Sequence, residues 1–210
     1  MAVLSKSALQ RLAVLHALSL WRRGAYGAIR VQKTLFFADH ESEPKWRLFT
    51  FKKWRLGQYS DEVSDALNVL HAAGRVTSWF DGPAERLKAE VPKPRQREIS
   101  DLFRNHFSDW FKNLNRAFTK WAYLHNDTII QRAHDDLTFK ASRCGEVVFS
   151  SFDYEQLELS GLDDEIAESL SDLVDSRLQH GLAKRLAAAV QRPQEREDWR
   201  SIYFDRSGQT

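Results

Sequence analysis

The chain has 210 residues, of which 42% are hydrophobic and 29% charged, a composition typical of a folded globular protein. No apolar run approaches the about 20 residues needed to cross a bilayer. The apolar N-terminal segment is interrupted by Lys6, Gln10 and Arg11, so neither a membrane span nor a secretory signal is expected. The single cysteine, Cys144, excludes an internal disulfide and a multi-thiolate zinc site and favours a reducing cytoplasm.

The net charge of +2 hides an asymmetry between the two ends of the chain. Residues 1–60 contain 11 Lys and Arg residues and 3 acidic residues. Residues 153–210 contain 7 Lys and Arg residues and 13 acidic residues. Nine of those acidic residues lie between Asp153 and Asp175, with no basic residue among them. Such a run predicts either a solvated helix face or a surface that docks a partner.

The first half of the chain alternates helical and strand patterns. A helix is expected over residues 4–23, apolar around most of its circumference and therefore central to the core. A second helix follows over residues 27–40, and an aromatic-rich strand over residues 45–56.

A capped helix and a hairpin complete this half. Ser60 is placed to cap a helix that ends before Gly74, and the turn Asp81-Gly82-Pro83 joins two strand-like segments within residues 75–91. Helices, a strand, a helix and a β-hairpin follow one another in the order of a winged helix-turn-helix. We therefore expect a winged-helix-like lobe over residues 1–92 with a small antiparallel sheet.

The second half is predicted to be a helical lobe over residues 95–210, packed on the first as one compact unit. A long amphipathic helix is expected over residues 99–121 and another over residues 127–136. A short strand at residues 145–151 precedes two terminal helices, at residues 161–178 and 182–191. The fold class is thus α+β and mostly helical.

Two sequence blocks, RVQKTLFFADH and FKKWRLGQYSDEVSDALNVLHAAGRV, resemble the Panacea family of SocA-like antitoxin domains. The matching residues are Gln32, Lys33, Leu35, Phe36, Phe37 and Ala38 in the first block, and Gly57, Tyr59, Ser60 and Gly74 in the second. Gln58 departs from the pattern, since the family usually has proline there. The segment AKRLAAAVQRPQEREDW also resembles the family's last helix and the tryptophan after it. The resemblance implies a protein that neutralises a toxin, by direct binding or by delivering it to a protease, and that performs no chemistry itself.

A protein-binding role agrees with the 7 Trp, 5 Tyr and 13 Phe, because large aromatic residues and Arg anchor interfaces. The residues predicted to bind a partner are Gln32, Lys33, Phe36, Phe37, Trp54, Arg55, Gln58, Tyr59 and Ser60. Structural roles are the alternative for several of them. Lys33 would then be a partly buried core cation, Tyr59 would close a turn, and Trp54 would pack in the core.

Nucleic-acid binding is a second hypothesis. Between residues 45 and 55, cations alternate with aromatic residues and no acid occurs; the candidate contacts are Lys45, Arg47, Lys52, Lys53 and Arg55. The alternative is a sheet whose aromatic side chains pack inward while the cations reach solvent, and we favour it because antiparallel strands are commonly covered on one face. Asp61, Glu62 and Asp65 would also present the wrong charge to phosphates.

Enzymatic function has little support. His106, the pair His134-Asp135 and Asp163 or Asp164 have the order of ligands in HD-type metal phosphohydrolases, but seven His among many acids produce such an order by chance. No nucleophile-elbow, P-loop or dinucleotide-binding motif occurs. We therefore expect a cytoplasmic, non-enzymatic antitoxin-type protein without metal or cofactor. Its expected partners are a cognate toxin, a protease and operator DNA, and a winged-helix regulator is the leading alternative.

Overall fold

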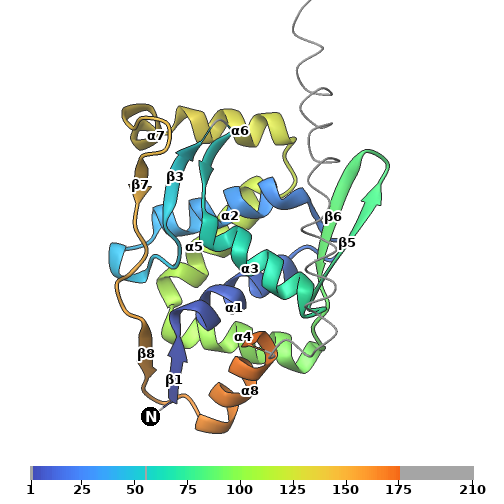
Figure 1. The fold of residues 1–210 in the computed structure, drawn as a ribbon, viewed down its shortest axis with the longest axis vertical. Helices are drawn as coiled ribbons and strands as arrows, with labels where there is room; N and C mark the ends of the chain where they lie inside the picture. The colour runs from blue at the N-terminus through green and yellow to red at the C-terminus, as the bar shows by residue number, and fades with distance from the viewer. Residues whose placement is uncertain (1, 55, 176–210) are drawn as a thin grey trace, which may run out of the picture. The chain divides into compact units, whose positions relative to one another are not determined.

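The computed structural model describes residues 2–54 and 56–175, which belong to one compact unit (Figure 1). The fold is α+β and mostly helical, with small antiparallel sheets, as the sequence predicts. The predicted terminal helix at residues 182–191 and the family-like segment there lie outside the described residues, as does Arg55. No helix in the described part is long and apolar enough to cross a membrane.

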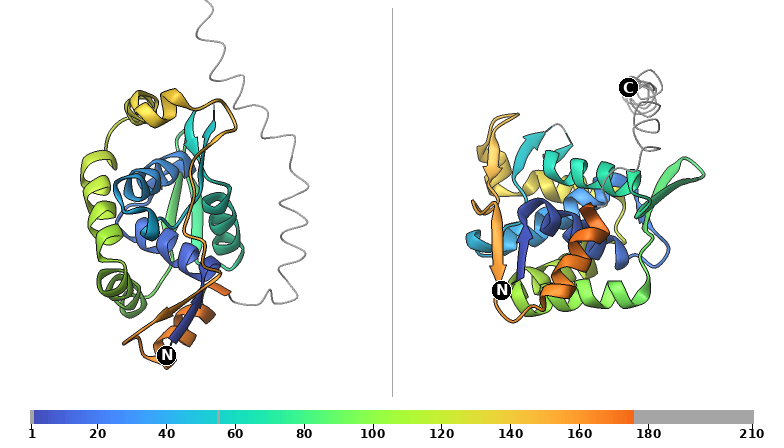
Figure 2. Two further views of the ribbon diagram at one scale, coloured as in Figure 1. Left: turned by 90° about the vertical axis from the view of Figure 1, so that its left-hand side faces the viewer. Right: turned by 60° about the horizontal axis from the view of Figure 1, so that its bottom comes forward.

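The first helix, α1 (Lys6–Ser19), is central, as its apolar circumference predicts. Ser5 caps it by accepting a hydrogen bond from the Ala8 backbone N–H at 3.1 Å, and ten of its residues are buried. The expected start at residue 4 is wrong, because residues Ala2–Ser5 form strand β1, which pairs with β8 (Gln156–Leu159) (Figure 2). The expected end at residue 23 is also wrong, since the helix ends at Ser19.

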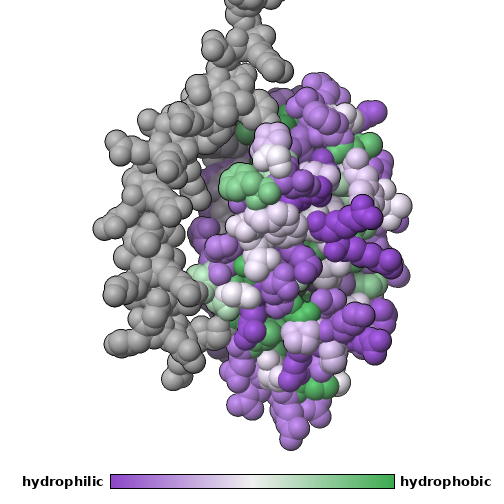
Figure 3. Space-filling view, turned by 90° about the vertical axis from the view of Figure 1, so that its right-hand side faces the viewer, coloured by the Kyte–Doolittle hydropathy of each residue, from purple (hydrophilic) through white to green (hydrophobic). Residues whose placement is uncertain are grey.

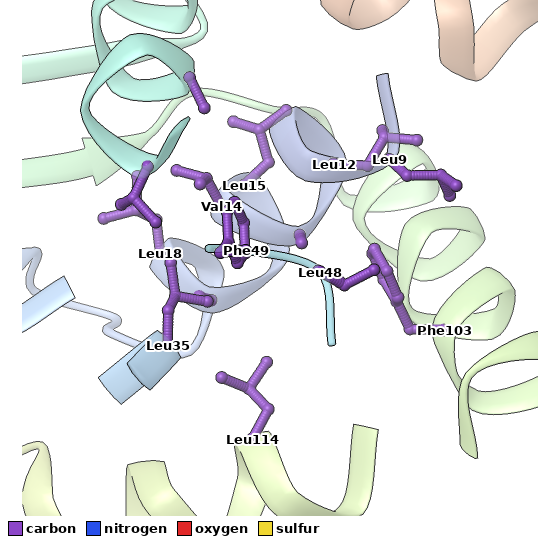
Figure 4. Packing of buried hydrophobic residues seen from close by; sticks show 14 of the residues in the cluster. Leu9, Leu12, Val14, Leu15, Leu18, Leu35, Leu48, Phe49, Phe103 and Leu114 are labelled. Carbon is purple, nitrogen blue, oxygen red and sulfur yellow. The ribbon is translucent and has the colours of Figure 1, made fainter. Parts of the chain in front are cut away.

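The hydrophobic core surrounds α1. Helices α2 (Gly27–Glu41), α3 (Asp61–Ala72) and α4 (Lys93–His106) all contact it, and α5 (Ser108–Trp121) packs on α2. Figure 4 shows side chains from α1, α2, α4, α5 and the loop at residues 48–49 meeting in this core. Ser60 caps α3 through the Val63 N–H, and Gly74 follows its end at φ +70°, both as predicted.

One three-stranded sheet carries a projecting hairpin. Strands β5 (Val76–Asp81) and β6 (Ala84–Ala89) form the predicted hairpin, and the short strand β2 (Ala25–Tyr26) pairs with β6 in the order β2-β6-β5. Figure 1 shows the hairpin extending beyond the helices, and the sheet order places β5 at the edge.

A second three-stranded sheet replaces the single strand expected over residues 45–56. The chain instead forms a 3-10 turn (Pro44–Trp46), strand β3 (Phe51–Trp54) and strand β4 (Gly57–Tyr59). Strand β7 (Val147–Phe149), predicted as a short strand, completes the order β4-β3-β7. The expected strand is too long because Pro44 favours a helical turn, and Leu48 and Phe49 are wholly buried in the loop before β3.

The predicted helix over residues 99–121 is two helices. It breaks at Phe107, whose φ of −130° and ψ of 46° leave the helical region. Phe103 and Trp110 on either side are fully buried, so the break lets both α4 and α5 cover the core. Helix α6 (Asn126–Asp135) agrees with the prediction, a short α7 (Leu137–Ala141) follows, and α8 (Asp164–Asp175) starts three residues later than expected.

The predicted boundary at residues 92–95 does not separate the sheets. Strand β7 joins β3, and β8 joins β1, so segments near residues 147–159 complete sheets begun in the first half of the chain. Residues from both predicted lobes therefore share one core cluster.

Candidate partner-binding face and the polar junction beneath it

The two family-like sequence blocks meet at a buried polar junction. The side-chain amide of Gln32 pairs with the backbone of Ser60 in both directions: its nitrogen donates to the Ser60 carbonyl at 2.9 Å, and its oxygen accepts from the Ser60 N–H at 3.0 Å. Both residues are buried. Because a buried polar group is costly unless it is hydrogen bonded, this pairing fixes α2 against the start of α3.

Lys33 forms the second part of the junction. Its Nζ donates a 2.6 Å hydrogen bond to the Gln58 backbone carbonyl, and the residue is only 3% exposed. Burial lowers the pKa of the Lys33 amine to about 7. Gly57 makes room for it, since a Cβ there would lie 2.6 Å from Lys33 Nζ.

A chain of hydrogen bonds leads from this junction to the surface. The nitrogen of Gln32 also donates to Ser64 Oγ at 3.0 Å, and that hydroxyl bonds with the Tyr59 hydroxyl at 2.7 Å. Tyr59 is half-buried. The chain therefore holds the Tyr59 ring in place through a residue, Ser64, that sequence reasoning missed, although it lies four residues after the predicted N-cap.

Gln58 links the junction to a distant helix. Its side-chain nitrogen donates to the Ala133 carbonyl of α6 at 2.8 Å, while its side-chain oxygen is buried without a hydrogen-bond partner. The proline usual in the family could not form this bond. Gln58 is the residue at which the sequence departs from the SocA-like pattern. Its side chain contacts Ala133, which lies 75 residues further along the chain.

The aromatic residues of the first block are core residues. Phe36 packs against both Phe51 and Phe149, with ring centroids 5.4 and 5.5 Å away, and Phe37 stacks on Trp121 at 4.9 Å. Six of the residues predicted to bind a partner are thus buried: Gln32, Lys33, Phe36, Phe37, Gln58 and Ser60. A side chain enclosed by the protein's own core and junction cannot contact a partner in this conformation.

Two of the predicted partner-binding residues, Trp54 and Tyr59, do reach the surface, on one face of the β4-β3-β7 sheet. We call Lys52, Trp54, Tyr59 and Val147 the outer face. Lys52 lies between Tyr59 of β4 and Val147 of β7 in the strand register, and Trp54 is two residues further along the same side of β3. Trp54 and Val147 are 50% and 54% exposed.

Lys52 holds the outer face together. Its ammonium lies 5.8 Å from the Trp54 ring centroid and 5.9 Å from the Tyr59 ring centroid. It also forms a 2.6 Å ion pair with Asp61 at the start of α3. Half of the Trp54 surface is exposed, and its register partner on β4 is Gly57, which has no side chain to cover the ring.

The predicted nucleic-acid contacts do not form a patch. Lys53 points to the opposite side of the sheet and donates to the carbonyls of Phe139 and Ser142, both at 2.7 Å. The Arg47 guanidinium lies 4.6 Å from the Phe149 ring centroid, and Lys45 pairs with Glu43 at 3.0 Å. The favoured alternative, aromatic residues packed inward, is correct for Phe49 and Phe51. Of the cations, Lys53 is bound to backbone carbonyls, whereas the side chain of Lys45 is 64% exposed beside Glu43.

A buried carboxyl that sequence reasoning passed over joins three elements. Asp39 of α2 accepts hydrogen bonds from the Phe49 N–H at 2.7 Å and from Trp110 Nε1 at 2.6 Å. Burial raises the pKa of Asp39 to about 8, although these donors and the charge of Arg47 oppose the shift. The only sequence signal was an acid within the apolar run FFADH.

The residues suggested as ligands in the metal-hydrolase hypothesis make other contacts or lie at helix ends. His134 stacks on Phe139 with ring centroids 4.9 Å apart, and Asp163 accepts from the N–H groups of Glu165 and Ile166 at the start of α8. His106 ends α4. Within residues 2–54 and 56–175, no group of three or more His, Cys, Asp or Glu side chains is arranged to hold a metal ion.

The acidic segment lies on β8, α8 and the turns around them. Its members Asp153, Glu155, Glu158, Glu165, Glu168 and Asp172 are exposed. The solvated-face interpretation agrees with this exposure.

No protein-family model matches the chain, and no curated protein matches it. The similarity to SocA-like antitoxins therefore remains an interpretation of the two sequence blocks.

Proposed function

We propose that this protein is a cytoplasmic, non-enzymatic antitoxin-type protein that binds a cognate toxin through the outer face. The single observation that carries the proposal is Trp54, half exposed on an uncovered sheet face directly beside the buried junction of Gln32, Lys33 and Ser60. The family resemblance supports the same role, because both of its sequence blocks build that junction.

The outer face has the chemistry of an interface centre. Tryptophan and tyrosine contribute large contact areas with little loss of side-chain entropy, and hot spots are enriched in both. Tyr59 is held by Ser64, and Lys52 by Asp61, so little ordering is left to occur on binding. Preorganisation of this kind improves affinity because fewer side chains lose freedom in the complex.

Most residues predicted to bind a partner are buried, and we assign to them the role of positioning the β4-β3-β7 sheet. Gln32, Lys33 and Gln58 position β4 and α3, and β4 carries Tyr59 to the surface. We assign to these three residues a positioning role, and to Trp54 and Tyr59 a contact role. Direct blocking of a toxin and its delivery to a protease both begin with such a contact.

The test compares two baits that differ at the outer face. Tagged wild-type protein and Trp54→Ala are used to capture partners from the native host, with Tyr123→Ala as control, since Tyr123 is 75% exposed beyond the end of α5 and is not part of the outer face. We expect one stoichiometric protein to bind the wild type and Tyr123→Ala, with at least tenfold less on Trp54→Ala. A loss of about 2 kcal/mol at a hot spot corresponds to roughly thirtyfold.

The captured protein is then expressed alone and together with each variant. An antitoxin role requires growth arrest by the captured protein alone and rescue by the wild type and Tyr123→Ala, but not by Trp54→Ala. Equal capture by all three baits would reject the outer face as the binding site. A captured protein that is harmless when expressed alone would reject the antitoxin role.

DNA binding is a second candidate, favoured by one specific observation. The order α1, β2, α2, α3 and the β5-β6 hairpin, with strands β3 and β4 inserted between α2 and α3 and with the sheet order β2-β6-β5, supports a winged-helix interpretation. Arg22 and Arg23 are exposed just before β2. Asp61 and Asp65 on α3 are exposed and oppose it. A gel shift on the upstream DNA over a salt series tests it, because each lost phosphate contact lowers the slope by about 0.9. Replacing Arg22 and Arg23 by Ala should then lower the slope by about 2.

A further inference from the structure

Strand β5 presents an unpaired edge on the projecting hairpin. The Glu90 N–H donates to the Arg75 carbonyl at 2.8 Å, which shows that odd-numbered residues of this segment direct their backbone groups toward β6. The backbone groups of Val76, Ser78 and Phe80 therefore point away from β6. In the described part of the chain, no strand pairs with this side of β5.

The edge lacks the usual protection against strand pairing. Natural edge strands are blunted by lysine, proline, a bulge or short length. Strand β5 has six residues, VTSWFD, with regular register to β6 and neither lysine nor proline within it. Its residues from Thr77 to Asp81 are exposed, and Phe80 is 77% exposed, the largest exposed fraction of any described aromatic side chain.

We propose that β5 pairs antiparallel with β5 of a second copy of this chain, with Ser78 opposite the partner's Ser78. This register joins the two sheets in the order β2-β6-β5-β5-β6-β2. It brings the outward backbone groups of Val76, Ser78 and Phe80 opposite those of the partner's Phe80, Ser78 and Val76. About six new backbone hydrogen bonds result, two for each facing pair.

The side chains fit a second copy in this register. Val76 lies opposite the partner's Phe80, but Val76 is itself only 2% exposed, so this pair is joined through the backbone and the Phe80 ring lies over the base of the partner's hairpin. Arg75 lies opposite the partner's Asp81, and the two-fold symmetry repeats this pair of opposite charges. Within one chain, Arg75 Nε also donates to the Leu173 carbonyl at 3.1 Å and Asp81 pairs with Arg86 at 2.8 Å, so the new pair adds long-range attraction to contacts already made. Thr77 lies opposite the partner's Trp79, a β-branched and aromatic pair of the kind that stabilises sheets.

The hairpin's surroundings indicate a modest interface. The side of the molecule that faces the viewer in Figure 3 is mostly hydrophilic, with apolar patches separated by polar side chains. Association therefore depends on backbone pairing and a few side chains rather than on a broad apolar surface. Small protein interfaces are weak, and one pair of six-residue strands makes a small interface, so the dimer should form reversibly as the protein concentration rises.

Disulfide trapping tests the register directly. Ser78→Cys is prepared with Cys144→Ser, because the native cysteine is exposed. Facing residues in a hydrogen-bonded pair have Cα atoms about 5.5 Å apart, within the range that a disulfide spans. The matched control is Thr77→Cys in the same background. In the proposed register its two copies are offset by two residues, about 8 Å between Cα atoms, which is too far.

We expect a covalent dimer from Ser78→Cys under mild oxidation, seen on a non-reducing gel, and at least fivefold less from Thr77→Cys. Equal trapping of both variants, or none of Ser78→Cys, would reject the register. This result does not depend on the proposed toxin partner, because the experiment uses the purified protein alone and leaves Trp54 unchanged.

Light scattering of the native protein tests the dimer itself. From micromolar to submillimolar concentration, the mass should rise from the 24.4 kDa of one chain toward twice that value. Ser78→Pro removes an outward N–H without removing a bond to β6, so the variant should keep its circular dichroism spectrum and remain a monomer throughout. A constant monomer mass for the wild type, or unchanged dimerisation of folded Ser78→Pro, would overturn the proposal.

Discussion

The ammonium of Lys33 occupies the space that a side chain at Gly57 would need. A Cβ on Gly57 would lie 2.6 Å from Lys33 Nζ, and the Nζ is itself fixed by its 2.6 Å hydrogen bond to the Gln58 carbonyl. The two family-like sequence blocks are thus coupled by steric fit as well as by hydrogen bonds. The same fit determines where the strand that carries Tyr59 can lie.

Gly57→Ala should destabilise the protein more than a glycine replacement that is strained only in the backbone. Gly57 has φ +97°, and Gly145 has a similar φ of +90° with no atom within 4 Å of its Cβ position. Gly145→Ala should cost about 1 kcal/mol through backbone strain alone. Gly57→Ala should cost about 3 kcal/mol, because it also displaces the Lys33 amine from its acceptor. Urea unfolding measures both, and equal losses would refute the steric fit.

Lys33→Met should change how stability depends on pH. The pKa of Lys33 is about 7 in the folded protein and near 10.5 when unfolded, so the unfolded state binds more protons between these values. The free energy of unfolding of the wild type should therefore rise, relative to Lys33→Met, by up to about 1.4 kcal/mol per pH unit from pH 7 to 10. Denaturant titrations at several pH values measure this difference. Parallel profiles for the two proteins would contradict it.

His16→Phe should stabilise the protein in mild acid. Burial lowers the pKa of His16 to about 4, and its Nε2 has no hydrogen-bond partner between the stacked rings of Phe103 and Phe111. The unfolded state binds the proton between pH 6.5 and 4, so the wild type loses stability as pH falls through that window.

The phenylalanine variant lacks this titration. Its thermal midpoint should match or exceed that of the wild type at pH 7. Its free energy of unfolding, measured by urea titration, should then exceed that of the wild type by up to about 1.4 kcal/mol more for each pH unit toward pH 5. His16→Ala is the control that removes the titration but also the ring packing, and it should be less stable than the wild type at pH 7. A Phe variant whose advantage shrinks with acidification would exclude the burial effect.

Gln58→Pro, which introduces the residue usual in the SocA-like domains that the two sequence blocks resemble, should be tolerated. The backbone of Lys53 bonds to residues 145 and 146 beside β7, so its register partner Gln58 donates no backbone bond to β3. Proline then removes only the side-chain bond to Ala133, at a cost of about 1 kcal/mol. Tyr59→Pro is the matched control, because the N–H of Tyr59 faces Lys52 in the ladder and its loss should cost about 3 kcal/mol. Similar losses for both variants would disprove the assigned pairing.

Local patterns in the sequence were enough for much of the fold. The N-cap at Ser60, the end of α3 before Gly74 and the hairpin turn around Gly82 all follow from bonds between residues close in the chain. The apolar circumference of α1 also predicts its central place, because a helix without a polar face has to be surrounded. These features depend on few neighbours, so one sequence suffices to find them.

The candidate site could be predicted only in part. The two sequence blocks brought attention to Gln32, Lys33, Tyr59 and Trp54, which the structure places close together, but they did not separate buried residues from exposed ones. Gln32 and Lys33 are polar, and a polar residue on a helix is more often exposed than buried. Their burial depends on acceptors at Ser60 and Gln58, which lie 28 and 25 residues away in the chain.

The sequence by itself therefore determined the types of most elements, the cap at Ser60 and the hairpin turn, but not the bounds of the aromatic strand. Only the tertiary structure decided that β8 pairs with β1, that Lys53 turns inward to two carbonyls, and that Trp54 remains uncovered. The physical reason is distance along the chain. Helix caps and turns satisfy their hydrogen bonds locally, whereas the exposure of a side chain and the pairing of a strand depend on which remote segment packs against them.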